Sequence, residues 1–201
     1  MNNILKVISA ILILAFAVSN SFGFQELVEY TDFDYGYSFK FPPDWKLKKT
    51  PEKSDLGETR VAVQGTEGAV MVTVSKLETS VEKEKYDSNP NSDLLASQLM
   101  NWTVEQVYKK SSRQLNASKM MVTEKKTIPC DLGIKYYISS VHFVENNVAI
   151  TMSGIHVIPF GKPYLISFMM TIFLDSKTKK MTGFFDDIFN SFHLTNEKHP
   201  K

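Results

Sequence analysis

The sequence predicts an α+β fold, a three-layer α/β/α sandwich around a largely antiparallel sheet. Strand-like segments fill both halves of the chain and flank a central stretch with helical periodicity. A second helical stripe lies near the carboxyl end. The long hairpin expected over 134–158 is apolar on both faces, so each face needs a covering layer.

The first strand is expected at 37–41, where aromatic residues at odd positions alternate with polar ones. Pro42 and Pro43 end it, because proline has no N–H to donate to a neighbouring strand. Trp45 begins the next extended stretch, 45–48. These ten residues predict architecture and contain no nucleophile, base or metal cluster.

A hairpin follows, with strands at 60–64 and 70–75 joined over a loop with a glycine at each end. The polar segment 78–91 contains Asn89-Pro90 and is predicted to be a long loop. Ser92 or Asp93 can then cap a helix that ends near Lys109-Lys110, which suit the helix dipole. The apolar face of this helix is expected to comprise Leu95, Leu99, Trp102, Val104, Val107 and Tyr108.

The second half predicts four strands and a helix. The strands are expected at 121–128, 134–145, 148–158 and 164–174. The final helix places one apolar stripe on a single face, made of Met181, Phe185, Ile188 and Phe192.

The expected register of the central hairpin decides whether His142 and His156 can bind one metal ion. A two-residue turn at Asn146-Asn147 pairs His142 with Thr151 and His156 with Tyr137, which puts the histidines on opposite faces. A one-residue change in loop length reverses this parity but leaves the histidines far apart. We therefore expect no metal and no cofactor.

The same register predicts the composition of each face. One face would hold Tyr137, Ser139, Val141 and Phe143 with Val148, Ile150, Met152 and Ile158. The other would hold Ile134, Tyr136, Ile138 and Val144 with Ala149, Ile155 and Val157.

The amino terminus predicts a secretory signal peptide over 1–23. Lys6 precedes an apolar run at 7–18, and Ser21 and Gly23 are the small residues of a cleavage site. As a helix that run spans about 18 Å, short of a ~30 Å hydrocarbon core, so a retained anchor is the weaker alternative. We expect a secreted or periplasmic protein with one domain at 24–201 and no membrane span after cleavage.

Charge and cysteine content exclude further classes. After cleavage the chain has 22 basic and 22 acidic residues, which disfavours a nucleic-acid partner. Cys130 is the only cysteine, so no intramolecular disulfide can form. We expect Cys130 to be buried, with a free thiol or an intermolecular partner as alternatives.

Catalytic motifs are absent from the sequence. No nucleophile elbow or glycine-rich phosphate loop occurs, and Asp186-Asp187 diverge by about 100° on a helix. Asn101 and Asn116 begin glycosylation motifs, which matter only in a eukaryotic secretory pathway. We expect no catalytic residues.

Two loops are candidate binding surfaces. Phe160 and Lys162 lie in a loop bounded by proline and glycine, where an aromatic ring beside a cation can contact a partner. Tyr86 lies in segment 78–91 and can do the same. Simple strand connection is the competing interpretation for both.

The run Gly-Tyr-Ser-Phe-Lys-Phe-Pro-Pro-Asp-Trp at 36–45 resembles the opening strand of the PsbP-like superfamily. Ile-Phe-Asn-Ser-Phe at 188–192 resembles its closing helix. The resemblance implies an α/β/α sandwich that acts as a binding or accessory protein without a common catalytic site. The chain departs from DcrB-type lipoproteins in lacking a cysteine at the cleavage site, and from plant members in lacking a transit peptide.

We therefore expect a non-enzymatic extracytoplasmic binding or accessory protein whose partner is a protein or small molecule of the cell envelope. The alternatives are a structural subunit of an envelope assembly and a hydrolase with an unrecognised site.

Overall fold

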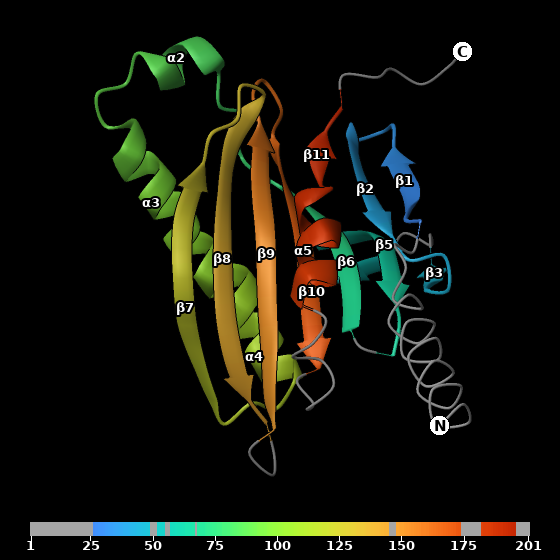
Figure 1. The fold of residues 1–201 in the computed structure, drawn as a ribbon. Helices are drawn as coiled ribbons and strands as arrows, with labels where there is room; N and C mark the ends of the chain where they lie inside the picture. The colour runs from blue at the N-terminus through green and yellow to red at the C-terminus, as the bar shows by residue number, and fades with distance from the viewer. Residues whose placement is uncertain are drawn as a thin grey trace, which may run out of the picture.

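The computed structural model describes residues 26–48, 52–54, 57–66, 68–144, 148–173 and 182–195. The expected signal peptide at 1–23 lies outside this part of the chain. Two antiparallel sheets dominate the fold (Figure 1). The large sheet has the order β3 (Lys46–Lys48), β5 (Gly57–Gln64), β6 (Gly68–Lys76), β10 (Tyr164–Phe173), β9 (Ala149–Pro159), β8 (Gly133–Phe143) and β7 (Lys119–Ile128), with β4 (Glu52–Ser54) also paired to β5.

The small sheet joins the two ends of the described chain. It has the order β1 (Val28–Asp32), β2 (Tyr37–Phe41) and β11 (His193–Leu194). The β1–β2 turn is built by Asp32, whose Oδ1 accepts hydrogen bonds from the amides of Asp34 (3.0 Å) and Tyr35 (3.2 Å). Gly36 closes the turn at a φ of +67°, which a residue without Cβ adopts freely.

One core lies between the small sheet and the large one. The aromatic side chains of β2 pack onto β6 and β10, together with the helix α5 (Thr182–Asn190). Phe168 of β10 stacks on Phe192 at 4.8 Å and meets Phe39 edge-on at 5.3 Å. The predicted strand at 37–41 and its inward aromatic face are therefore confirmed.

The second core lies under a long helical segment on the opposite face of the large sheet (Figure 1). This helical segment consists of α3 (Ser92–Thr103), a π-helical turn η1 (Val104–Tyr108) and α4 (Lys109–Gln114). The prediction that the helix ends at Lys109-Lys110 was wrong, since it continues for a further turn. Asn91 occupies the N-cap position, and its side chain makes no capping bond.

The buried face of this segment differs from the prediction at one position. Trp102 is 40% exposed, whereas Leu95, Leu99 and Val104 pack against the core and Val107 and Tyr108 are buried, as predicted. Ala96 and Thr103 are buried as well, so small side chains also face the sheet.

Segment 78–91 is not a simple loop. It contains the short helix α2 (Lys83–Asp87), whose Lys83 and Asp87 pair at 2.5 Å across one turn. The hydroxyl of Ser88 donates to the carbonyl of Glu84 at 2.7 Å and closes its carboxyl end. The Lys83–Asp87 ion pair and the Ser88 hydrogen bond therefore stabilise a helical turn in a segment whose polar composition predicted a loop.

The predicted strands at 121–128, 134–145, 148–158 and 164–174 correspond to β7, β8, β9 and β10, but the hairpin register was predicted one residue out. His142 pairs with Ile150 and His156 pairs with Tyr136. The two-residue turn was wrong, because this register leaves three residues between Val144 and Val148, whose backbones are hydrogen-bonded at 3.0 Å. Residues 145–147 lie outside the described part of the chain.

This register changes the composition of the two faces. The helix-facing side of the hairpin carries Ile134, Tyr136, Ile138, Ile150, Met152 and Ile158. Ile155 and Val157 belong to the other core. His142 and His156 therefore share a face, but lie six positions apart on the ladder, about 20 Å at ~3.3 Å per residue.

The described chain is thus mostly sheet with few helices, in keeping with an α+β class. Helix α3–α4 covers one face of the large sheet, while the small sheet and α5 lie over part of the other (Figure 1). Because that second layer combines a sheet with a helix, the strict three-layer α/β/α sandwich stays a prediction. Among the described residues no helix is both long and apolar enough to cross a membrane.

Candidate functional site

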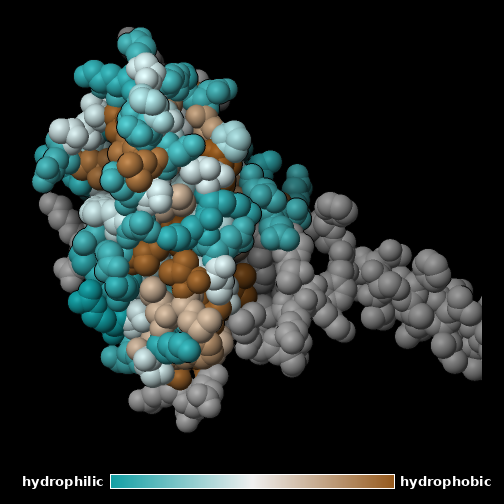
Figure 2. Space-filling model, turned by 90° about the vertical axis from the view of Figure 1, so that its left-hand side faces the viewer, coloured by the Kyte–Doolittle hydropathy of each residue, from teal (hydrophilic) through white to brown (hydrophobic). Residues whose placement is uncertain are grey.

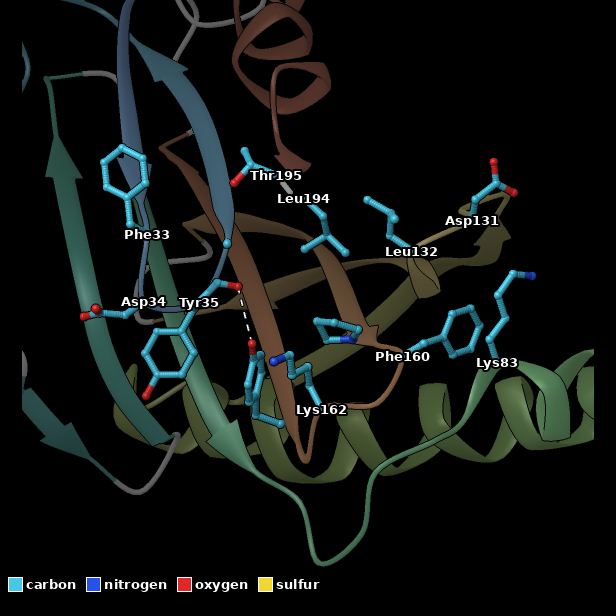
Figure 3. Close-up of a pocket in the computed structure, with 13 residues that line it drawn as sticks. Phe33, Asp34, Tyr35, Lys83, Asp131, Leu132, Phe160, Lys162, Leu194 and Thr195 are labelled. Atoms are coloured by element: carbon cyan, nitrogen blue, oxygen red, sulfur yellow. Dashed lines mark hydrogen bonds between the residues drawn. The ribbon is translucent and has the colours of Figure 1, made fainter. Parts of the chain in front are cut away.

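A groove of about 350 Å³ opens where the small sheet meets one end of the large sheet (Figure 3). Four parts of the chain that are distant in sequence line it: the turn 33–36, Lys83 of α2, the turn 131–132 and the loop 159–164, with Leu194 and Thr195 beside them. Phe160 and Lys162, which the sequence singled out, both line this groove.

Tyr86 lies behind the groove wall. Its ring packs against Phe160 at 5.7 Å between centroids, and the ammonium of Lys83 lies 5.6 Å from the same ring. The amide of Gly161, at a φ of +70°, donates to the carbonyl of Val81 at 2.9 Å. The structure therefore brings Tyr86, Phe160 and Lys162 to one place, with Tyr86 supporting Phe160 from outside the groove.

The facing wall is aromatic and held from the small sheet. Tyr35 meets Tyr164 edge-on at 5.1 Å, and the Tyr164 hydroxyl donates to the Tyr35 carbonyl at 3.5 Å, drawn as a dashed line in Figure 3. Because one ring comes from the β1–β2 turn and the other from β10, this contact fixes the small sheet over the end of the large sheet.

Arg60 of β5 anchors the same turn. Its guanidinium pairs with Asp32 (3.1 Å), Asp34 (2.7 Å) and Glu58 (2.7 Å) and lies 4.8 Å from the Tyr35 ring. Burial opposes the charged form, yet the hydrogen bonds to these carboxylates raise the pKa of Arg60 above its ordinary value. Sequence reasoning missed this cluster, since the residues lie on different strands and no local pattern joins them.

Within the described residues two of the four charged side chains of the groove are paired, and one exposed charge of each sign remains, Lys162 and Asp131. Asp34 is bound by Arg60, and Lys83 is bound by Asp87, with nearby Asp131 also favouring its charged form. Lys162 is exposed and forms no ion pair within the described part of the chain. Lys162 is therefore the groove cation that remains available to a ligand.

A second polar cluster, buried under α3–α4, was also missed. The Tyr108 hydroxyl donates to the Ile138 carbonyl at 2.9 Å and lies 3.0 Å from Nε2 of His156, whose Nδ1 lies 2.9 Å from Oγ of Ser167. Since the phenol has one proton, we assign Nε2–H as its donor and Ser167 as the donor to Nδ1.

This cluster offers no access to a substrate. Burial lowers the pKa of His156 to about 3, so the ring is neutral. A Cβ on Gly154 would lie 2.6 Å from both the imidazole and the phenol oxygen, so the space is full. The hydrogen bonds of Tyr108 therefore dock the π-helical turn onto the sheet, and the buried serine–histidine contact holds the imidazole in place and is not a catalytic pair.

The other singled-out residues lie away from the groove lining. Cys130 is half-buried, so its predicted full burial was wrong: it lies in the connection between β7 and β8 and not within a strand. Asn101 is exposed and accepts a hydrogen bond from Lys125 at 2.7 Å, and Asn116 is exposed at a φ of +51°. Asp186 and Asp187 are both exposed on α5.

The side of the molecule formed by β7 and α3 is a competing surface. Met121 and Trp102 on these elements are 44% and 40% exposed. Figure 2 looks onto this side and shows hydrophobic patches separated by hydrophilic residues. On this side of the molecule the exposed hydrophobic side chains are therefore scattered, whereas in the groove aromatic and charged side chains lie together.

Comparison with known proteins identifies the fold. No protein-family model and no curated protein sequence matches the chain. Among solved structures, the cyanobacterial PsbP protein (CyanoP) of Synechocystis sp. PCC 6803 is similar with a TM-score of 0.55 at 16% identity, covering 86% of this chain and 94% of that one. The Ran-binding protein Mog1p of Saccharomyces cerevisiae matches with a TM-score of 0.46 at 9% identity, covering 85% and 96%.

The likeness to the cyanobacterial PsbP structure shows the PsbP-like fold that the residues at 36–45 and 188–192 predicted. At these identities the likeness concerns the fold alone.

Proposed function

We propose that this protein is a non-enzymatic binding or accessory protein that acts outside the cytoplasm and captures its partner in the groove at Phe160 and Lys162. One observation carries the proposal: four separate segments converge to place an aromatic ring, an available cation and a second aromatic wall around one concave surface. Loops held on a rigid sheet are where binding residues concentrate.

The chemistry of the groove favours binding over catalysis. Asp34 and Lys83 are held in ion pairs. Three serine–histidine contacts occur among the described residues, Ser167–His156, Ser140–His142 and Ser38–His193, and the serine is buried in each. A hydrolase needs a nucleophile and a base that reach the substrate, and these buried serine hydroxyls do not.

The extracytoplasmic part of the proposal rests on the amino-terminal sequence, where Lys6, the apolar run 7–18 and small residues at Ser21 and Gly23 have the layout of a signal peptide. The partner would then be a protein or small molecule of the cell envelope. Fractionation of cells, with the amino terminus of the purified protein sequenced, tests this. A chain that begins at Met1 in the cytoplasm would overturn it.

The binding part is tested by affinity purification after chemical crosslinking in intact cells. A variant with Phe160→Ala and Lys162→Glu is expected to lose at least one crosslinked partner and to remain folded, with a urea midpoint lowered by the lost packing between Phe160 and Tyr86. The matched control carries Met121→Ala and Lys119→Glu on β7, and should retain every partner. Recovery of the same partners with both variants would refute the assignment of the groove as the binding site. A partner that copurifies in fixed stoichiometry with both variants would indicate a structural subunit of an assembly.

A further inference from the structure

We infer that the groove takes an extended acidic peptide segment, which adds as a strand to the edge of β11 and places a carboxylate against Lys162. This inference rests on the proposed function and names the chemistry of the partner at that site.

The first argument is the edge of the small sheet. In the described chain β2 is the only neighbour of β11. The amide of Thr195 donates to the carbonyl of Gly36 at 2.8 Å, on the β2 side. Backbone groups alternate in direction along an antiparallel strand, so the N–H and C=O of Leu194 point away from β2.

That outward side faces the groove. Leu194 and Thr195 both line it, and Figure 3 shows Leu194 between β2 and the side chain of Leu132. A peptide can therefore form main-chain hydrogen bonds with Leu194 while lying in the groove, which is the geometry of strand addition.

The second argument is the apolar surface beside this edge. Leu194, Leu132 and Pro159 line the groove together, and Leu132 is 38% exposed although it is a large aliphatic residue. Alternate side chains of an added strand point to the same face. One apolar side chain of the peptide can therefore cover Leu132.

The third argument is charge. Lys162 lies on the wall opposite Leu132 (Figure 3), exposed and without an ion pair among the described residues. Arg60 and Asp87 pair with Asp34 and Lys83, and the exposed Asp131 lies on another part of the groove, so a carboxylate on the peptide gains most beside Lys162 and away from Asp131. The groove therefore favours a segment with an apolar residue followed at short range by an acidic one.

A small aromatic carboxylate could use the same lysine and the ring of Tyr164, but would leave the backbone of Leu194 unused. Main-chain pairing is thus the feature that separates the two ligand classes.

The test uses the purified protein, labelled with ¹⁵N, and the peptide acetyl-Thr-Val-Leu-Thr-Glu-Thr-amide. Titration is followed by the amide chemical shifts of Leu194, Thr195 and Lys162. Two matched peptides replace Glu by Gln, or carry an N-methyl group on the leucine amide. Benzoate is the small-anion probe.

We expect the parent peptide to shift all three amides. The Glu-to-Gln peptide and the Lys162→Ala variant should each weaken binding about two- to five-fold, as exposed ion pairs do. Combining them should cost no more than either alone, because they remove the same pair. N-methylation should weaken binding about five-fold through the lost main-chain hydrogen bond, and the exposed Lys119→Ala control should bind as the wild type does.

Absence of binding by the parent peptide, or equal binding of its N-methylated form, would overturn strand addition. Benzoate binding as tightly at the same amides would assign the groove to small anions instead. If crosslinked partners still depend on Phe160 and Lys162 in either case, the proposed function stands and only the peptide chemistry fails.

Discussion

The buried imidazole of His156 makes stability depend on pH in a defined direction. Burial lowers its pKa from the ordinary 6.5 to about 3, while in the unfolded chain it returns to the ordinary value. Between these values the unfolded chain binds one more proton than the folded one. Stability is therefore complete above pH 6.5 and is lost as the pH falls towards 3.

The size of the effect follows from the same shift. One pKa unit corresponds to about 1.36 kcal/mol, so lowering the pH from 7.5 to 4.5 should cost about 2.5 kcal/mol through this residue, and the full window about 5 kcal/mol. His142, whose pKa burial also lowers, adds a smaller contribution in the same direction.

Urea unfolding followed by circular dichroism at pH 7.5 and 4.5 measures this loss. His156→Gln keeps a donor and an acceptor for Tyr108 and Ser167 but does not titrate. We expect it to be less stable than wild type at pH 7.5 by about 1–3 kcal/mol and to lose clearly less on acidification. An equal acid loss in His156→Gln and wild type would refute the reasoning.

Three further changes test the supports of the fold. Gly154→Ala should destabilise the protein by about 2–4 kcal/mol in urea unfolding, because the new Cβ displaces Tyr108 from its buried hydrogen bonds; a loss below about 1 kcal/mol would contradict the tight packing. Arg60→Ala leaves the buried carboxylate of Asp32 without its cation and should cost about 2–4 kcal/mol, with Lys in its place restoring part of the loss; native-like stability of the alanine variant would show that the cluster does not hold the turn. Trp102→Ala should change the unfolding free energy by less than about 1 kcal/mol, since the ring is 40% exposed, and a larger loss would restore the helix face predicted from periodicity.

Strand positions could be predicted from the sequence because their signals are local. In 37–41 the alternation of aromatic and polar residues and the prolines that follow are all within one short run, and the structure buries Tyr37 and Phe39 completely. The closing helix near Ile188 was predictable for the same reason. Ile188 and the aromatic residues of 37–41 pack in the same core.

The hairpin register could not be predicted as well, because a difference of one residue in the loop decides which side chains share a face. A loop of three residues in place of two exchanges the faces of β9, so Ile150 and Ile155 changed sides. On the helix the periodicity predicted every packed position except Trp102, and it did not predict the burial of Thr103, whose hydroxyl meets that of Tyr136 on the sheet at 2.8 Å.

The candidate site was predictable only in part. Proline and glycine around Phe160 and Lys162 marked an exposed loop, and Tyr86 was singled out in the segment that packs against it. The opposite wall was not foreseeable, since Tyr35 and Tyr164 are 129 positions apart and meet only when the small sheet folds back.

The most direct test of the groove as the binding site is site-specific photocrosslinking in intact cells. A benzoylphenylalanine placed at position 132 on the groove is compared with one at position 121 on β7, since the native side chains there are similarly exposed at 38% and 44%. We predict a discrete crosslinked partner from position 132 and none of that mass from position 121. Equal crosslinking from both positions, or crosslinking from position 121 alone, would contradict the assignment of the groove as the site of partner binding.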